Sequence, residues 1–576
     1  MAEDDTSQAI DDVLITLGWR GRYQVLQLIQ LLLCVFPLAF NILSIVFIGK
    51  ANEHRCREID NATSHMWPPD VINVTYERCR VTWLNITGET MSASCPSGLE
   101  FSEPVDRSMV SEWNLVCENE ALTDVSQTLL LVGMMVGAVL FTSLADKYGR
   151  KPFHIGCHIG LLTVGVASAF VPAFSAFLPL RFFQGAFQQG TGLCCGILCM
   201  EILPARHRFV QSVIGSFLWA FGMVVLSLVA YLMRDVSWRY LQLAFAGFSL
   251  YCILQIWFTD ESVRWLVANG KIKQAEQILK KAAAMNKVSE KKVLDLFRSK
   301  VLRQRLTSEK PLGGDNNPLT MDPAENGGET LQTGLLVAEE RPELAQYSFM
   351  DFFRYKYVSL CTAINGFAWI VNSMTYYGLS MTSVSLADDM YLGFFLSAAV
   401  ELPTAIVFTC LVERIGRKKC CDIFHVLAGL SLLLSVTVSS LAGDEEAAGI
   451  AVIVLSLLGK FSISVTFAVL FLFTPEQFPT NLRNASLGVA SMSGRVGAMV
   501  APYSRTLSRH YPWATGTIFG LCCLLVPLCM RMLPETCGRE LPQTIEQMTI
   551  YITTPYEVTY RKKKYPNQKN KKAAII

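Results

Sequence analysis

Charged residues are scarce in this sequence. Asp, Glu, Lys and Arg make up 17% of its 576 residues, whereas an ordinary soluble domain contains about 25%. Hydrophobic residues account for 51%, and the mean hydropathy is +0.34. This composition argues against an ordinary soluble protein and indicates a chain whose main solvent is lipid.

The sequence also lacks the marks of several other protein classes. Its 50 Lys and Arg residues are balanced by 48 Asp and Glu residues, so no charge excess favours nucleic acid as a partner. No GxxxxGK[ST] phosphate-binding loop occurs, the nearest glycine-lysine pair being Gly459-Lys460 inside an apolar run. His154 and His158 are spaced for one helix face, but no acidic residue completes a metalloprotease pattern. We therefore expect neither an enzyme nor a bound metal ion or other cofactor.

Long apolar runs, in contrast, are abundant. A membrane-spanning helix needs about 20 apolar residues, because no water is present in the bilayer to satisfy backbone groups. The runs cover residues 26–48, 125–145, 153–172, 177–200, 211–233 and 241–258, and then 358–380, 391–412, 422–441, 450–473, 485–507 and 515–533. The sequence therefore predicts an all-α membrane protein with twelve transmembrane helices.

The charges between the runs predict the orientation. The acidic start MAEDDTSQAIDD lacks the basic region of a secretory signal, so we expect no removable signal peptide. The connections KYGRKP, ARHR and ERIGRKK are basic, whereas those around Pro172, Asp388 and Asp444 carry no Lys or Arg. Because basic connections stay in the cytoplasm, both termini are predicted to be cytoplasmic.

The chain divides into five predicted parts. Residues 1–22 form a cytoplasmic N-terminus, 23–259 a first six-helix bundle with an outer loop at 50–124, 260–357 a cytoplasmic loop, 358–536 a second six-helix bundle, and 537–576 a basic cytoplasmic tail. The cytoplasmic loop begins with helical periodicity from Ile272 to Ala282. We expect this helix to lie against the inner surface.

The outer loop combines cysteines with glycosylation sequons. Its cysteines are Cys56, Cys79, Cys95 and Cys117, and its sequons begin at Asn61, Asn73 and Asn85. Both features suit an extracellular, oxidising compartment. We expect two disulfides, whose pairing the spacing does not define, and N-glycans on a loop outside the plasma membrane.

The chain repeats itself at an offset of about 270 residues. DKYGRK from Asp146 recurs as ERIGRK from Glu413, and the spacing of Glu201, Pro204 and Arg208 recurs in the second half. The charged residues of these repeats can form ion pairs that act as a conformational latch between two parallel six-helix bundles. The predicted latch residues are Asp146, Arg150, Glu201, Arg208, Glu261 and Arg264 in the first half and Glu413, Arg417, Glu476 and Arg483 in the second.

These motifs resemble those of a known superfamily. SLADKYGRKP, ERIGRKK and RFFQGAFQQG resemble the major facilitator superfamily, and the resemblance spans nearly the whole chain. SEWNLVC, ESVRWLVANGKIKQAEQIL and LPETCGRELPQTIEQ resemble its organic cation, organic anion and carnitine transporter family, solute carrier family 22. The resemblance implies transport by alternating access, and it leaves open uniport, exchange or coupling to an ion.

Three ionisable residues fall inside apolar runs of the second half. Glu401, Lys460 and Arg495 are functional candidates because a charge inside a membrane is costly. Alternatively, Glu401 and Lys460 form a structural ion pair. The segments around Arg495 and Lys460 resemble the carnitine and anion branches of the family, and VELPTA around Glu401 resembles a family carboxylate position.

Aromatic residues give a second indication, because a cationic group binds well over an electron-rich ring. Tyr376 and Tyr377 in the seventh run and Trp219 in the fifth are the candidates. Each could instead be a helix-packing residue. With Arg495, Lys460 and Glu401 they define the predicted substrate site.

The combined prediction is a plasma-membrane transporter that moves a small organic ion through the lipid bilayer. Two positive groups, one negative group and aromatic rings favour a carnitine-like zwitterion. An organic anion exchanger is the alternative if Lys460 and Arg495 act together, and an organic cation uniporter is the third choice. A receptor or scaffold that does not transport is the alternative of another class.

Overall fold

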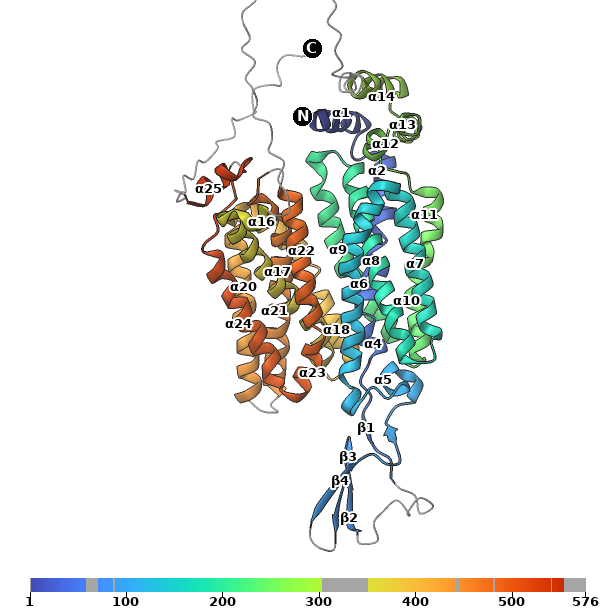
Figure 1. The fold of residues 1–576 in the computed structure, drawn as a ribbon, viewed down its shortest axis with the longest axis vertical. Coiled ribbons are helices and arrows are strands. Elements are labelled where there is room, and N and C mark those ends of the chain that lie inside the picture. The colour runs from blue at the N-terminus through green and yellow to red at the C-terminus, as the bar shows by residue number, and fades with distance from the viewer. Residues whose placement is uncertain are drawn as a thin grey trace, which may run out of the picture.

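A computed structural model describes residues 2–58, 71–85, 89–302, 351–441, 446–479, 482–539 and 541–553. Its long helices form two bundles that lie side by side, one from each half of the chain (Figure 1). A small region of β-strands extends from one end of the molecule, here called the sheet end. Short helices cover the first bundle at the opposite end, here called the cap end.

The helices of the first half follow the predicted runs. In chain order they are α2 (Arg22–Leu32), α3 (Val35–Leu43), α4 (Ile45–Ile48), α6 (Ala121–Tyr148), α7 (Arg150–Phe170), α8 (Phe174–Ile202), α9 (Phe209–Leu232), α10 (Trp238–Gly247) and α11 (Cys252–Phe258). Helices α2 to α4 together cover the first run, and α10 and α11 cover the sixth.

The second half repeats this pattern. Its helices are α16 (Asp351–Arg354), α17 (Lys356–Thr382), α18 (Met390–Ala399), α19 (Thr404–Ile415), α20 (Arg417–Leu441), α21 (Glu446–Glu476), α22 (Arg483–Val500), α23 (Tyr503–His510), α24 (Pro512–Met530) and α25 (Ile545–Thr553). The predicted all-α membrane fold is confirmed, since every predicted run falls on helical segments.

Nine segments of the described chain are long and apolar enough to cross a membrane. Three further long helices, α8, α17 and α22, contain 29, 27 and 18 residues but are less apolar. Buried polar side chains explain the difference, including Arg181 in α8 and Asn372 in α17. Because polar groups in a bilayer are tolerated where they face protein or a cavity, these helices mark the polar interior of the bundles.

The described residues of the sheet end form five strands. They are β1 (His54–Cys56), β2 (Val71–Tyr76), β3 (Arg80–Asn85), β4 (Thr90–Ser94) and β5 (Leu99–Phe101). Strands β2, β3 and β4 form one antiparallel sheet, and β1 pairs with β5. The disulfide Cys56–Cys95 joins β1 to the end of β4, and Cys79–Cys117 joins the turn before β3 to the segment that precedes α6.

The sequons lie in the same region. Asn73 is part of β2 and Asn85 ends β3, whereas Asn61 lies outside the described residues. Whether these positions carry glycans stays a prediction.

The cap end is built from four helices. They are α1 (Ala2–Leu17), α12 (Val263–Ala268), α13 (Ile272–Asn286) and α14 (Glu290–Phe297). Apolar side chains of α1, such as Val13 and Leu17, share a core with Leu279 and Phe297. The helix expected from the periodicity at Ile272 is therefore α13, and it packs with the N-terminal helix. Residues 303–350 and 554–576, which include most of the predicted basic tail, lie outside the described residues.

Candidate functional site

Five of the six predicted substrate-site residues form one connected group between the bundles. Trp219 of α9 donates its indole N–H to the Tyr376 hydroxyl at 2.7 Å, which bridges the two halves. The Tyr376 hydroxyl donates in turn to Glu401 Oε2 at 2.9 Å. Tyr377 packs edge-on against Tyr376, with ring centroids 5.2 Å apart. Side chains from both halves therefore meet at Tyr376.

Glu401 and Lys460 form a buried ion pair. Lys460 Nζ lies 3.0 Å from Glu401 Oε1, and their side chains are 2% and 5% exposed. The same ammonium group donates to the Tyr376 carbonyl at 3.1 Å and to Ser380 Oγ. It also lies over the Tyr376 ring, 3.4 Å from the centroid. The alternative that the sequence left open, a pair between these two residues, is the arrangement found.

A break in the helical structure positions Glu401. Helix α18 ends at Ala399 and α19 begins at Thr404, so Glu401 lies in the turn between them. Thr404 Oγ1 donates to the Glu401 carbonyl at 2.6 Å, which satisfies a backbone acceptor in this turn. Pro403 lacks an N–H group and therefore favours such a break. Interrupted helices are a common device for exposing polar groups at a transport site.

Arg495 lies apart from this ion pair. It belongs to α22 and donates from Nη2 to Gln189 Oε1 of α8 at 3.0 Å, which makes a second bridge between the halves. Tyr377 lies next to it. No carboxylate forms an ion pair with Arg495 among the described residues. The central site therefore has one positive charge in excess, carried by a guanidinium that cannot lose its proton.

Polar contacts also join the halves at the sheet end. Arg509 of α23 pairs with Glu120, Thr506 donates to Asp124 of α6, and Arg505 donates to the Gly49 carbonyl at 3.0 Å. The Phe47 ring stacks on Tyr391, with centroids 5.7 Å apart. We call these contacts the outer gate. The polar ones place acidic residues of the first half against basic residues of the second at the sheet end.

The repeated motifs form matching clusters in the two halves. In the first, Arg150 lies 3.1 Å from Asp146 and 3.5 Å from Glu201. In the second, the corresponding Arg417 lies 2.9 Å from Glu413 and 3.4 Å from Glu476. Each cluster stays within its own half, so these pairs brace each bundle. The predicted exchange of pairs during transport stays a prediction.

A carboxylate completes each cluster at the start of a helix. Glu261 accepts from the backbone N–H of Lys151, at 3.2 Å from each oxygen, and Glu535 accepts from the N–H of Arg417 at 2.8 Å. A negative charge is stabilising at a helix N-terminus. Burial raises the pKa of Glu261, an effect that the N–H donors of Ser262 and Lys151 oppose.

The remaining predicted latch residues differ between the halves. Arg264 pairs with Asp11 of α1 at 2.5 Å, and Asp11 also accepts from the N–H of Ala205. Arg483 donates to the carbonyls of Phe478 and Pro542, both at 3.3 Å. Arg208 forms no ion pair with another described residue, and its buried Nε donates to none of them.

Sequence comparison identifies the family. Residues 120–502 match the Major Facilitator Superfamily. The chain belongs to this superfamily. An organic cation transporter-like protein of Drosophila melanogaster is 30% identical over 93% of this chain and 91% of its own length. Solute carrier family 22 member 20 of Mus musculus is 30% identical over 94% of each chain, and mouse organic anion transporter 3 is 28% identical over 96% of each. This places the chain in solute carrier family 22 of the superfamily.

A solved structure supports the fold. The xylose transporter XylE of E. coli in an inward open conformation matches 90% of this chain with a TM-score of 0.59 and 14% identity. As a member of solute carrier family 22, the protein is a multi-pass membrane transporter and not an enzyme. Among the described residues, His54, Cys79 and Cys117 alone lie close enough together to resemble a metal site. Both cysteines are committed to a disulfide.

Three partners of predicted residues were not predicted from the sequence of this solute carrier 22 protein. Arg495 donates to Gln189, and Lys460 donates to Ser380. Arg264 forms an ion pair with Asp11. Gln189 lies within the quoted segment RFFQGAFQQG, where two adjacent glutamines inside an apolar run were the available signal. Asp11 and Ser380 carry no such signal, because an acidic N-terminus and a helical serine are common in membrane proteins.

Proposed function

We propose that this protein transports a small organic ion that carries a carboxylate, by alternating access across the plasma membrane. The sheet end faces the outside in this proposal, and both termini face the cytoplasm. Disulfides and sequons at the sheet end support this orientation. The outer gate supports a conformation that is closed to the outside, with the substrate site between the two rocking bundles.

Arg495 carries the substrate assignment. It is the ionisable residue of the predicted site whose charge no described carboxylate neutralises, and it bridges the two halves through Gln189. A guanidinium can hold a carboxylate with two parallel hydrogen bonds. A substrate carboxylate that replaces Gln189 at this position would link its binding to the relative movement of the halves.

Two substrate types fit this site. A carnitine-like zwitterion is our first candidate, because rings of Trp219 and Tyr376 from opposite halves meet beside Glu401. The Lys460 ammonium group over the Tyr376 ring supports a preference of these rings for a cation. An organic anion is the second candidate, because the pairing of Glu401 with Lys460 leaves a positive charge in excess.

Uptake by cells that express the chain tests the proposal. The probes are radiolabelled L-carnitine, glutarate and tetraethylammonium, and the variants are Arg495→Ala, Arg495→Lys and the control Arg531→Ala, an exposed arginine at the cap end. We expect Arg495→Ala to lower carboxylate-probe uptake, as kcat/KM, about tenfold or more, since a charge-assisted hydrogen bond contributes at least that factor. Arg531→Ala should have no effect.

The outcomes separate the candidates. Carnitine uptake in excess of glutarate supports the zwitterion, and the reverse supports the anion. Transport of tetraethylammonium alone, unchanged by Arg495→Ala, would disprove the carboxylate assignment.

A further inference from the structure

A cavity of about 680 Å³ lies between the halves at the sheet end, directly beside the outer gate. Val46, Lys50 and Ala51 of the first half line one part of it, and the segment from Thr382 to Tyr391 lines another. Arg505, Ser508 and Arg509 of α23 complete the wall. We call this cavity the outer vestibule. It is separate from the Trp219–Tyr376 group.

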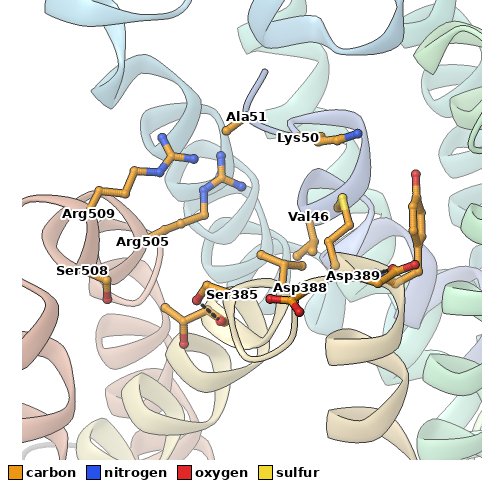
Figure 2. A pocket seen from close by; sticks show the side chains of 13 residues that line it. Val46, Lys50, Ala51, Ser385, Asp388, Asp389, Arg505, Ser508 and Arg509 are labelled. Atoms are coloured by element: carbon orange, nitrogen blue, oxygen red, sulfur yellow. Dashed lines mark hydrogen bonds between the residues drawn. The ribbon is translucent and has the colours of Figure 1, made fainter. Parts of the chain in front are cut away.

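Charges of both signs face the vestibule. Figure 2 shows the guanidinium groups of Arg505 and Arg509 on one side of it and the carboxylates of Asp388 and Asp389 on another. Lys50 also lines the cavity. Groups of opposite charge across one opening suit a ligand that itself carries both signs.

Most of these charges already have partners. Lys50 lies 2.6 Å from Glu103, and Arg509 pairs with Glu120. Asp389 accepts from the N–H groups of Tyr391 and Leu392 at the start of α18. These groups line the vestibule, but their partners within the protein already take up most of their hydrogen-bonding capacity.

Two groups of opposite sign keep unused capacity. Arg505 donates from Nη2 to the Gly49 carbonyl, but its Nε is buried and donates to no described residue. Asp388 is exposed and forms no hydrogen bond or ion pair with a described residue. A buried donor without a partner costs free energy, so an acceptor that reaches it binds favourably.

We propose that the outer vestibule binds a small zwitterion, with its carboxylate on Arg505 and its ammonium group on Asp388. This inference rests on the proposed function, because it narrows the carboxylate-bearing substrate to a zwitterion and gives it an entry site outside the central one. Arg505 belongs to both the vestibule and the outer gate. A carboxylate bound to Arg505 competes with the Gly49 carbonyl and thereby weakens the contact that holds the halves together.

Protection of an introduced cysteine tests the vestibule without requiring transport. Ser385 lines the cavity, is exposed and donates to Thr382 O at 2.7 Å. Ser440 is an exposed serine of α20 that donates to Val436 O at 2.9 Å and lies outside the lining, so it is a matched control. Intact cells expressing Ser385→Cys or Ser440→Cys are labelled with a membrane-impermeant maleimide, with or without L-carnitine, choline or glutarate.

We expect L-carnitine to slow labelling of Ser385→Cys and to leave Ser440→Cys unchanged. Asp388→Asn should weaken this protection about tenfold, which is the effect of losing one charged contact. Choline and glutarate, each lacking one of the two charges, should protect only at concentrations about tenfold higher. Arg505→Gln should abolish protection by both carnitine and glutarate.

The same experiment in an Arg495→Ala background separates this inference from the proposed function. Protection that persists there supports the vestibule even if that variant, or the wild type, transports none of the probes. Protection that disappears would mean that the central site controls labelling from a distance, which would overturn the vestibule. Equal protection by carnitine, choline and glutarate, or no protection by carnitine, would also overturn it.

Discussion

At the scale of single residues, the buried pair of Glu401 and Lys460 determines what the other charges can do. Each side chain is almost fully buried, and both contact Tyr376. Removing one partner of such a pair leaves an uncompensated charge in a medium that solvates it poorly. The pair therefore makes the site's geometry depend on both residues together, whereas Arg495 forms no ion pair with a described residue.

This arrangement predicts a non-additive effect on stability. Lys460→Met alone should lower the free energy of unfolding by about 3–5 kcal/mol, because Glu401 stays charged without its partner. The double variant Lys460→Met/Glu401→Gln should recover most of that loss. Melting temperatures of the purified full-length protein in detergent measure both effects. A double variant that melts below Lys460→Met would contradict the buried-pair account.

The predicted site residues lie near one another in the structure, but the sequence did not predict all of their partners, and their role in transport stays a prediction. Charge inside an apolar run identified Glu401, Lys460 and Arg495, because such placement is costly and therefore informative. Sequence did not reveal that Gln189 bonds Arg495, since this contact joins residues 306 positions apart. Contacts between halves depend on the conformation of the whole molecule, which local patterns do not encode.

At the scale of elements, the duplicated turns share one backbone conformation in the two halves. Gly149 joins α6 to α7 with φ +112°, and Gly416 joins α19 to α20 with φ +108°. A Cβ atom at Gly149 would lie 2.6 Å from Glu261 Oε2, and one at Gly416 would lie 2.5 Å from Glu535 Oε2. The glycine thus lets a carboxylate reach the start of the next helix, which explains why both recur together in the two halves.

The turn therefore predicts a contrast between two glycines of the first half. Gly149→Ala should destabilise the protein by about 1–3 kcal/mol, because the backbone conformation is strained for alanine and the new methyl group displaces Glu261. Gly156→Ala in α7 should be neutral or stabilising by roughly 0.5–1 kcal/mol, since alanine favours helix and nothing lies within 4 Å of its Cβ position. Melting temperatures in detergent compare the two. Equal melting temperatures of the two variants would contradict a requirement for glycine in the turn between α6 and α7.

Element boundaries were predicted less well than element existence. The eighth run was expected as one span from 391 to 412, but it is divided into α18 and α19 around Glu401. A continuous apolar run does not indicate a break in the helix. Pro403 is the one sequence feature here that favours the break, because it lacks a backbone N–H. The strands of the outer loop were not predicted either. Its cysteines and sequons indicated the compartment of the loop but carry no information on its secondary structure.

At the scale of the whole molecule, the two bundles meet through the central group and the outer gate. Acidic Glu120 and Asp124 of the first half face basic Arg505 and Arg509 of the second at the sheet end. The motif clusters at the cap end instead pair within each bundle. This asymmetry fits a transporter captured closed at the sheet end. Opening there must break the gate contacts, whereas each braced bundle can move as a unit.

Cross-linking the outer gate tests this account most directly. Glu120→Cys and Arg509→Cys are combined in one chain, and a short reducible thiol cross-linker bridges them in intact cells while uptake of the best-transported probe is measured. Both single-cysteine variants receive the same reagents, which controls for effects on the native disulfides. The account predicts that cross-linking abolishes uptake and that reduction restores it in the double variant alone. Full cross-linking with unchanged uptake would show that the sheet end need not open, and would contradict alternating access through this gate.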